Sequence, residues 1–439
     1  MRFSAQRICG DINYTTSSSY ISMCRRVNEN HFSRNRKMPL PKLLLTILNR
    51  RGASLAVELR RFRELSDTQE TISKPGYSKQ RLKLAPEAIM ALCDFHNEGL
   101  YREEDMRTLN GYLVLASDGS GINVPTTRET LEKYGASSRK GTKPQASIGF
   151  SCLYDILNKL ILCCSVNRVK FDEAAQAKAH LERVKSIIGN RKTIITLDRG
   201  YPSLPLFFRW SGQNQKFVVR LKGSDFKAER KHMGSDDEWV DITFDKTRLA
   251  HYKGTEIHDL LERAGAICLR IVNFKLDGGA VVSVATNLDE SEFSVDDVAR
   301  VYALRWGIET AFDVLKNNLE IENFTGSLSV LIEQDIYASV YLCNVLQDMI
   351  ADAQIAYDSS GKPKGKHTMA INKSYAVGIM KDNLVKALLE SDLEKKTEIF
   401  TQMLADIQKN VLPIRPDRHF ARTKGVLAGK YSNSRKRCY

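Results

Sequence analysis

The sequence predicts a mixed α/β fold built on a central sheet, and three observations lead to that prediction. Apolar runs of strand length alternate with an amphipathic helical segment between residues 108 and 223. Two of these runs, GYLVLASDGS and KTIITLDRGY, contain an aspartate near their ends, Asp118 and Asp198. Helical periodicity dominates residues 1–100 and most of the chain beyond residue 290. We therefore expect a mixed sheet flanked by helices, preceded by an N-terminal helical domain.

The first part of the core, residues 108–223, begins with the strand that ends at Asp118. The runs ASIGFSCLYD and KLILCCSVN are separated by ILN, which predicts a β-hairpin. DEAAQAKAHLERVKSIIG is an amphipathic helix, with Asp172 as its N-cap and Gly189 at its end. The strand that ends at Asp198 follows, and KFVVRLKG adds one more.

Residues 224–289 are expected to form a β-rich insertion, because short strand candidates alternate there with Gly and Asp turns. Trp239 in this insertion is expected to lie in its core. Residues 290–350 return to the main core, and SVDDVARVYALRWGIETAFDVLKNNL is predicted to be one long helix with Ser294 as N-cap. Residues 351–439 are expected to be a helical, basic region for dimerisation or DNA contact.

Length and composition describe a globular protein of two or three domains, since 42% of the 439 residues are apolar and 27% are charged. No apolar run is long enough to cross a membrane, and the N-terminus lacks the apolar segment of a secretory signal. The nine cysteines include no C-x-x-C pair. We therefore expect reduced thiols in a cytoplasmic protein rather than a disulfide framework or a zinc site.

The net charge of +14 is concentrated at both ends of the chain. Residues 1–60 contain 11 Lys and Arg against 3 acidic residues, and residues 410–439 contain 8 against 1. Such patches suit a polyanion, because binding phosphates releases counterions, although two solubilising tails would have the same composition. The short basic helices near the N-terminus fit either a helix-turn-helix reader of DNA or an ordinary helical domain. The candidate phosphate contacts in this region are Arg34, Arg36 and Lys37.

A further set of polar residues lies in YALRWGIETAFDVLK, residues 302–316. Since a helix turns about 100° per residue, Tyr302, Arg305, Glu309 and Lys316 fall within about 60° of one another. This stripe borders the apolar side of the helix, where the wall of a site would lie. A solvated charged edge with i,i+4 pairs is the alternative.

Three carboxylates, Asp118, Asp198 and Glu309, are candidates for one metal site. The two aspartates end strands, and α/β sheets bind ligands at that edge, although each could also be a turn cap. Carboxylates without a matching His or Cys set favour Mg²⁺ or Mn²⁺. Two such ions about 3.5–4 Å apart can activate a water or a 3′-hydroxyl for attack on a phosphodiester. Arg305 and Lys316 would then hold phosphates of the bound strand.

The joint pattern resembles the IS-four family of bacterial DDE transposases. The chain has Asp118 in SDGSG, Asp198 in LDRGY, and the spacing Y-x2-R-x3-E-x6-K from Tyr302 to Lys316. The order of two aspartates, a β-rich insertion and Glu309 is also similar to that family, as are FSRNRKMPLPKLL and RPDRHFARTK. The resemblance covers essentially the whole chain.

The resemblance implies an RNase H-like core in which Asp118, Asp198 and Glu309 bind two Mg²⁺ ions, with Mn²⁺ as a substitute. It implies cut-and-paste transposition of double-stranded DNA: hydrolysis at the element end, a hairpin formed by the freed 3′-hydroxyl, its reopening, and strand transfer. The other residues of the spaced motif would contact the transferred DNA end. The partner would be a second copy of the chain, in a homodimer that pairs two ends in the bacterial cytoplasm, associated with the nucleoid.

Two alternatives stay open. A nuclease of the same fold would cut DNA without joining it, and a DNA-binding regulator would have an inactive core. The intact Asp118, Asp198 and Glu309 argue against the regulator, because a binding protein has no need of three carboxylates that repel DNA. Arg199, directly after the second aspartate, is a candidate phosphate contact, with a surface salt bridge as the alternative.

Overall fold

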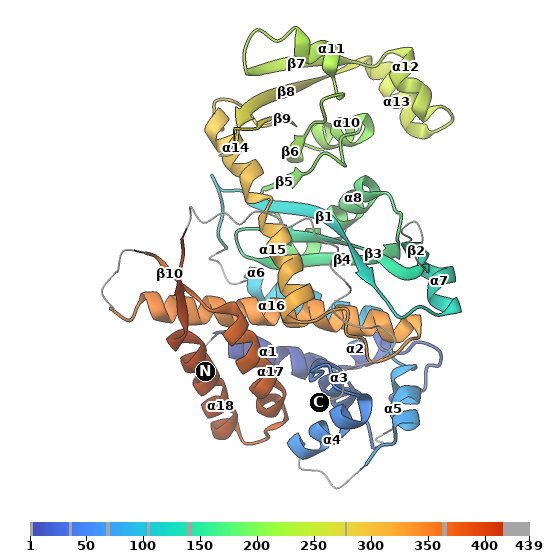
Figure 1. Cartoon of the computed structure of the whole chain (residues 1–439), viewed down its shortest axis with the longest axis vertical. Helices are drawn as coiled ribbons and strands as arrows, with labels where there is room; N and C mark the ends of the chain where they lie inside the picture. The colour runs from blue at the N-terminus through green and yellow to red at the C-terminus, as the bar shows by residue number, and fades with distance from the viewer. Residues whose placement is uncertain are drawn as a thin grey trace.

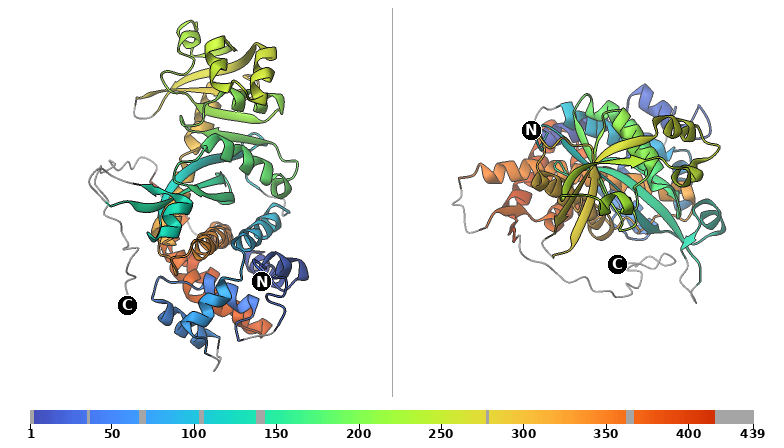
Figure 2. Two further views of the ribbon diagram at one scale, coloured as in Figure 1. Left: turned by 90° about the vertical axis from the view of Figure 1, so that its right-hand side faces the viewer. Right: turned by 90° about the horizontal axis from the view of Figure 1, so that it is seen from above.

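The computed structural model describes residues 3–34, 37–66, 71–102, 106–137, 143–276, 279–361 and 367–415. In Figure 1 a sheet occupies the middle and top of the molecule, and a layer of helices lies below it. The left view of Figure 2, turned by 90° about the vertical axis, shows the same layers. None of the helices in this described part of the chain combines the length and the apolar character needed to span a bilayer.

The sheet has nine strands, in the order β2-β3-β1-β5-β6-β9-β8-β7, and β4 also pairs with β3. Strand β3 is antiparallel to β1 and β4, whereas β1, β5 and β6 run parallel. The order β4-β3-β1-β5-β6 with these directions is the RNase H-like arrangement, so the predicted mixed sheet and its hairpin are confirmed. The strands are β1 (Leu113–Asn123), β2 (Ala136–Ser137), β3 (Gln145–Asp155), β4 (Leu160–Arg168), β5 (Thr193–Leu197), β6 (Lys216–Arg220), β7 (Asp237–Thr243), β8 (Ala266–Lys275) and β9 (Val281–Thr286), with the separate pair β10 (Met369–Ile371) and β11 (Val411–Pro413).

Helices cover the sheet and build the lower layer. They are α1 (Phe3–Tyr14), α2 (Ser18–Met23), α3 (Leu40–Leu48), α4 (Leu55–Leu65), α5 (Lys74–Arg81), α6 (Pro86–Arg102), α7 (Arg128–Tyr134), α8 (Glu173–Arg183), α9 (Lys185–Ile188), α10 (Leu204–Gly212), α11 (Lys227–Lys231), α12 (Lys246–Leu249), α13 (Glu256–Ala264), α14 (Val295–Leu304), α15 (Gly307–Asp313), α16 (Ser329–Asp358), α17 (Lys373–Leu389) and α18 (Leu393–Lys409).

Strand β1 shows why the sheet has a core on each face. Successive side chains of a strand point to opposite sides. Val114 and Ala116 belong to the core that contains α15, α16 and the N-terminal helices. Leu113 and Leu115 belong to the core that contains α8, α9 and α10. The first half of the strand that carries Asp118 is therefore buried on both faces, whereas residues 118–121, in its second half, are partly or fully exposed.

Local signals set the starts and ends of the helices near this edge, as predicted. Asp172 caps α8 by accepting a hydrogen bond from the Ala175 amide. Ser294 caps α14 in a capping box with Asp297. Gly189, with φ of 62°, ends α9. The single helix predicted between Asp172 and Gly189 is, however, divided at Val184 into α8 and α9.

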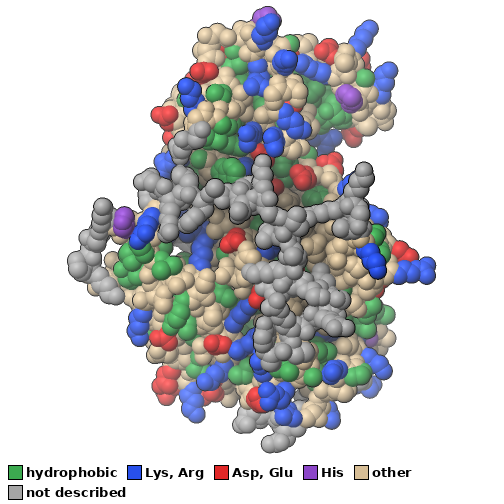
Figure 3. Space-filling view, in the orientation of Figure 1, with side chains coloured by type: hydrophobic (Ala, Val, Ile, Leu, Met, Phe, Trp, Pro, Cys, Tyr) green, Lys and Arg blue, Asp and Glu red, His purple; other side chains and the backbone are tan. Residues whose placement is uncertain are grey.

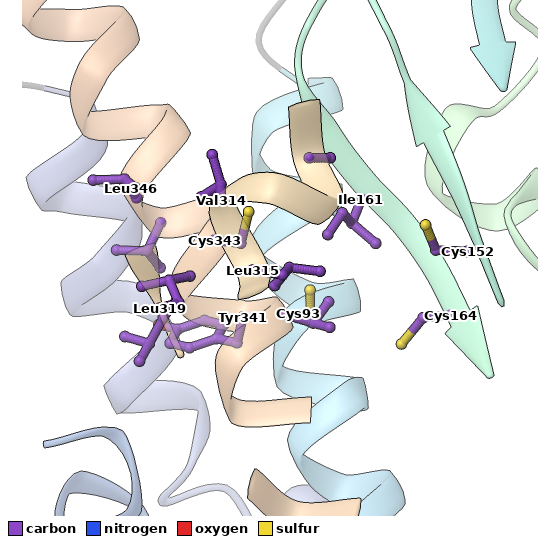
Figure 4. Packing of buried hydrophobic residues seen from close by; sticks show 14 of the residues in the cluster. Cys93, Cys152, Ile161, Cys164, Val314, Leu315, Leu319, Tyr341, Cys343 and Leu346 are labelled. Atoms are coloured by element: carbon purple, nitrogen blue, oxygen red, sulfur yellow. The ribbon is translucent and has the colours of Figure 1, made fainter. Parts of the chain in front are cut away.

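Helix α16 is the central helix of the lower layer and runs below the sheet in Figure 1. Most of its 30 residues are buried, which fits a helix surrounded by other elements. Figure 4 shows Val314 and Leu315, which follow α15, beside Cys343 of α16 and near Ile161 of β4. This packing holds the chain segment after α15 against the sheet. Helix α16 also runs through residue 350, where a domain boundary is predicted.

A buried ion-pair cluster attaches the N-terminal helices to α16. Asp335 lies 2.9 Å from the Arg81 guanidinium and 3.2 Å from that of Arg50. Burial alone would raise the pKa of Asp335, but the two guanidiniums hold it at about 2. Removing one partner of such a buried cluster is costly, so these helices are firmly attached to the core.

The segment between β6 and α14 extends the main sheet. Strand β9 pairs antiparallel with β6, and β8 and β7 follow, with α11 to α13 beside them at the top of Figure 1. The predicted core position of Trp239 is wrong. Its side chain is 40% exposed and its indole Nε1 donates to Glu290. The reason is that Trp239 points to the same face of β7 as Asp241 and Thr243, which are also exposed, so this face is open to solvent.

Candidate active site

Two parallel strands carry the candidate aspartates to one edge of the sheet. Strands β1 and β5 pair with Ala116 opposite Thr196, and an aspartate follows two residues later on each, Asp118 and Asp198. Because the strands are parallel and in register, both carboxylates reach the same C-terminal edge. The prediction that the first strand ends at Asp118 is wrong, because β1 continues to Asn123. Asp118 lies in the middle of β1, just beyond the part that pairs with β5, and still pairs with β3 opposite Cys152.

Helix α14 brings Tyr302 onto the second aspartate. The Tyr302 hydroxyl donates to Asp198 Oδ1 at 3.4 Å. Arg220, at the end of β6, lies 3.7 Å from the same oxygen and donates to the Tyr302 hydroxyl at 3.3 Å. Burial raises the pKa of Tyr302, so its hydroxyl keeps its proton at neutral pH. The three side chains hold one another in place at the strand end.

Arg305 is a buried arginine, only 3% exposed, beside the third carboxylate. Its guanidinium carbon lies 4.8 Å from the centre of the Trp306 ring and 5.7 Å from that of Tyr302. Its Nη2 is 3.7 Å from Glu309 Oε1. Stacking between two rings fixes the planar group, while its Nε has no hydrogen-bond partner among the described residues.

The pKa of Asp118 is the one most clearly affected by this arrangement. Burial raises it to about 6, and the charges of Glu173 and Asp198 act in the same direction. The Gly119 amide, which donates to Asp118 Oδ1 at 2.8 Å, and the Arg305 guanidinium oppose the rise. An ionised Asp118 is therefore unfavourable in the metal-free protein, chiefly because of its burial.

Lys316, the last residue of the spaced motif, contacts β1, the strand that carries Asp118. Its Nζ donates to Ser120 Oγ at 2.6 Å and to the Gly121 carbonyl at 2.9 Å. These residues lie just beyond Asp118 on β1, so Lys316 joins the segment after α15 to the strand. Burial lowers the pKa of Lys316, against the charge of Glu322.

The single long helix predicted over residues 294–319 is broken, which is a correction. Helix α14 ends at Leu304, α15 starts at Gly307, and a π-helical segment, Val314–Asn318, follows. At the first break, backbone amides bond to carbonyls three rather than four residues earlier. A Cβ at Gly307 would lie 2.8 Å from Ile156 Cγ2, so the chain passes the β3–β4 turn very closely here. The polar stripe predicted for a straight helix therefore does not describe the path of residues 302–316, although Tyr302, Arg305 and Lys316 still reach the same sheet edge.

The remaining predicted DNA contacts are Arg199, Arg34, Arg36 and Lys37. Arg199 is exposed, directly after Asp198, and Arg34 and Lys37 are exposed before α3. Arg36 lies outside the described residues, as does most of RPDRHFARTK. Figure 3 shows Lys and Arg side chains over much of this face, including the upper part of the molecule.

Two residues at this edge were not predicted from the sequence. Arg220 is the last residue of β6, which is parallel to β5. Its position at the end of a parallel strand would have indicated that it lies near the site. Glu173 begins α8 and acts electrostatically on Asp118. As an acid after an N-cap, Glu173 has no sequence signal that separates it from an ordinary first-turn residue.

A different group has the closest set of metal-binding atoms in the described part of the chain. His258, Asp259 and Glu262 on α13 have ligand atoms within 4.8 Å of one another. We call them the α13 cluster. The ligand atoms of the three predicted carboxylates are spread more widely. The α13 cluster lies on a short surface helix of the upper part of the molecule, where exposed acidic groups are common without a metal.

Comparison with known proteins identifies the family. The profile described as "Transposase DDE domain" matches residues 109–341, which contain all three predicted carboxylates. A similar solved structure is a piggyBac transposase synaptic complex with hairpin DNA, at a TM-score of 0.43 and 10% identity, covering 91% of this chain and 81% of that chain. So distant a likeness carries no conclusion about function. No curated protein matches the chain. The profile covers more than half of the 439 residues, and the chain therefore belongs to the transposase DDE domain family of enzymes.

Proposed function

We propose that this chain is a cut-and-paste transposase of the IS-four type, with Asp118, Asp198 and Glu309 as its catalytic carboxylates. The parallel register of β1 and β5 supports this most strongly, because it carries two carboxylates to one open strand edge. The α14–α15 segment supports it further, since Tyr302 contacts Asp198 and Arg305 lies beside Glu309.

The donor set fits a pair of hard divalent cations. DDE transposases use divalent metal ions, and carboxylate oxygens are the ligands that Mg²⁺ and Mn²⁺ prefer. Asp118, Asp198 and Glu309 would hold Mg²⁺, with Mn²⁺ as a substitute. When bound, such ions activate an attacking hydroxyl and stabilise the leaving oxygen of a phosphodiester.

The surrounding side chains would hold the carboxylates and the DNA. Tyr302 and Arg220 fix the orientation of Asp198. The guanidinium of Arg305, fixed beside Tyr302, Trp306 and Glu309, would add positive charge for a bound phosphate. Lys316 adds a positive charge beyond Asp118 on the same strand.

The wider assembly follows from the same proposal. Residues 1–100, with Arg34 and Lys37 exposed, would bind the double-stranded element end. Residues 351–439 would contribute to dimerisation and DNA contact, in a homodimer that pairs two ends in the cytoplasm near the nucleoid. Excision would proceed through a hairpin intermediate, which is reopened before strand transfer into target DNA.

An excision assay tests the proposal. The substrate is a supercoiled plasmid that carries the element encoding this chain, with Mg²⁺. Wild type is compared with Asp198→Asn and with the exposed control Asp236→Asn. We expect a released linear element with wild type and with the control only. Equal cutting by Asp198→Asn would refute the assigned site, and ends that are cut but never joined to a target plasmid would indicate a nuclease.

A further inference from the structure

Glu173 is a half-buried carboxylate beside the two aspartates of the sheet edge. A Cβ at Gly119 would lie 3.1 Å from Glu173 Oε1, and a Cβ at Gly200 would lie 3.1 Å from Glu173 Oε2. Gly119 directly follows Asp118, and Gly200 comes two residues after Asp198. The carboxylate of Glu173 therefore occupies space that any side chain at either glycine would fill.

Phe171 fixes the start of α8 against the sheet. A Cβ at Gly149 of β3 would lie 2.5 Å from Phe171 Cδ1, and a Cβ at Gly119 would lie 3.2 Å from Phe171 Cζ. Because glycine has no side chain, the phenyl ring can approach the sheet closely at these two strand positions. The position of Glu173, two residues later, is therefore set by packing rather than by a flexible loop.

No cationic side chain in the described part of the chain offsets the charge of Glu173. Among the described residues it forms no ion pair and accepts no hydrogen bond, and the charges acting most strongly on it are those of Asp198 and Asp172. A partly buried carboxylate among like charges is unfavourable unless a cation joins it. An acid in the first turn of a helix ordinarily stabilises the helix N-terminus. In α8, however, Asp172 already accepts the N-cap hydrogen bond.

We propose that Glu173 is a fourth carboxylate of the divalent-cation site, contributed by α8 in addition to Asp118, Asp198 and Glu309. This inference rests on the proposed function, because it assumes that the other three carboxylates hold cations. Four carboxylates balance the charge of two divalent cations, whereas three leave an excess of positive charge. Glu173 therefore increases the affinity of the site for cations before DNA phosphates enter it.

Binding of Mn²⁺ to the full-length protein tests this without relying on activity. The electron paramagnetic resonance signal of free Mn²⁺ gives the affinity in the absence of DNA. Glu173→Gln removes the charge and keeps the shape, and Asp198→Asn reports on the site as a whole. The matched control is Glu182→Gln, an exposed acid on the same helix that pairs with Lys185. We expect about 10-fold weaker binding for Glu173→Gln and no change for the control.

Two outcomes separate the inference from the proposed function. Unchanged affinity in Glu173→Gln with a loss in Asp198→Asn overturns the fourth-ligand role and leaves the three-carboxylate site standing. Equal affinity in all variants means that the cation does not bind at this edge, which overturns the proposed site as well.

The metal-free thermal midpoint distinguishes a merely structural role. Removing one of several like charges should leave the midpoint of Glu173→Gln equal to or above that of wild type. A lower midpoint with unchanged Mn²⁺ binding contradicts the inference. If Glu173→Gln does not fold, Glu173→Asp tests the role of Glu173 instead, because it keeps the negative charge but shortens the side chain. We expect Glu173→Asp to bind Mn²⁺ more weakly than wild type, and wild-type affinity would overturn the role.

Discussion

Replacing Asp118 by asparagine should stabilise the metal-free protein. Burial, together with the charges of Glu173 and Asp198, raises the pKa of Asp118 from 3.8 to about 6 in the folded chain. The folded state therefore holds this proton more tightly than the unfolded state, so stability falls as the pH rises between these two values. Since one pKa unit is worth about 1.4 kcal/mol, ionised Asp118 costs about 3 kcal/mol at pH 7.5 and about half as much at pH 5.

Urea unfolding in the presence of a chelator measures this cost. We expect Asp118→Asn to raise the free energy of unfolding by up to about 3 kcal/mol at pH 7.5 and by about half of that at pH 5. The exposed control Asp236→Asn should change it by less than about 0.5 kcal/mol. A loss of stability at pH 7.5, or a gain that grows as the pH falls, would refute the reasoning. Either result would mean that Arg305 and the Gly119 amide stabilise the ionised carboxylate more than burial destabilises it.

Three further predictions concern the helix break, the motif lysine and the basic N-terminal surface. Gly307→Ala should lower the free energy of unfolding by about 1–3 kcal/mol, because its Cβ would lie 2.8 Å from Ile156 Cγ2. The double variant with Ile156→Ala should lose less stability than the sum of the two single variants, and strict additivity would contradict the contact. Lys316→Met should reduce end cleavage about 100-fold while DNA binding persists, as measured on labelled ends; wild-type cleavage would remove Lys316 from the site. Arg34→Ala with Lys37→Ala should lower the salt slope of DNA binding by up to about 2, and an unchanged slope would place the end-binding surface elsewhere.

The strand framework of the site is predictable because its signals are local. Asp118 and Asp198 follow apolar runs, and parallel strands bring such ends together at one edge. The caps Asp172 and Ser294 are equally local, because an N-cap bonds only to residues of its own first turn.

The helix break could not be predicted, because its cause is distant in the sequence. Helical periodicity over residues 302–316 contains no information about Ile156, which passes Gly307 in the folded chain. The predicted core position of Trp239 is wrong for a similar reason, because no local signal indicates which face of a strand will be covered. Glu173 becomes notable only when the sheet brings the residues after the two aspartates to its carboxylate.

Locating Mn²⁺ in crystals of the protein by anomalous scattering tests the central claim most directly. We expect anomalous density at the sheet edge, between Asp118 and Asp198 and within reach of Glu309. Wild-type crystals with Mn²⁺ at the α13 cluster and none at the sheet edge would contradict the assignment of these three carboxylates as the catalytic site.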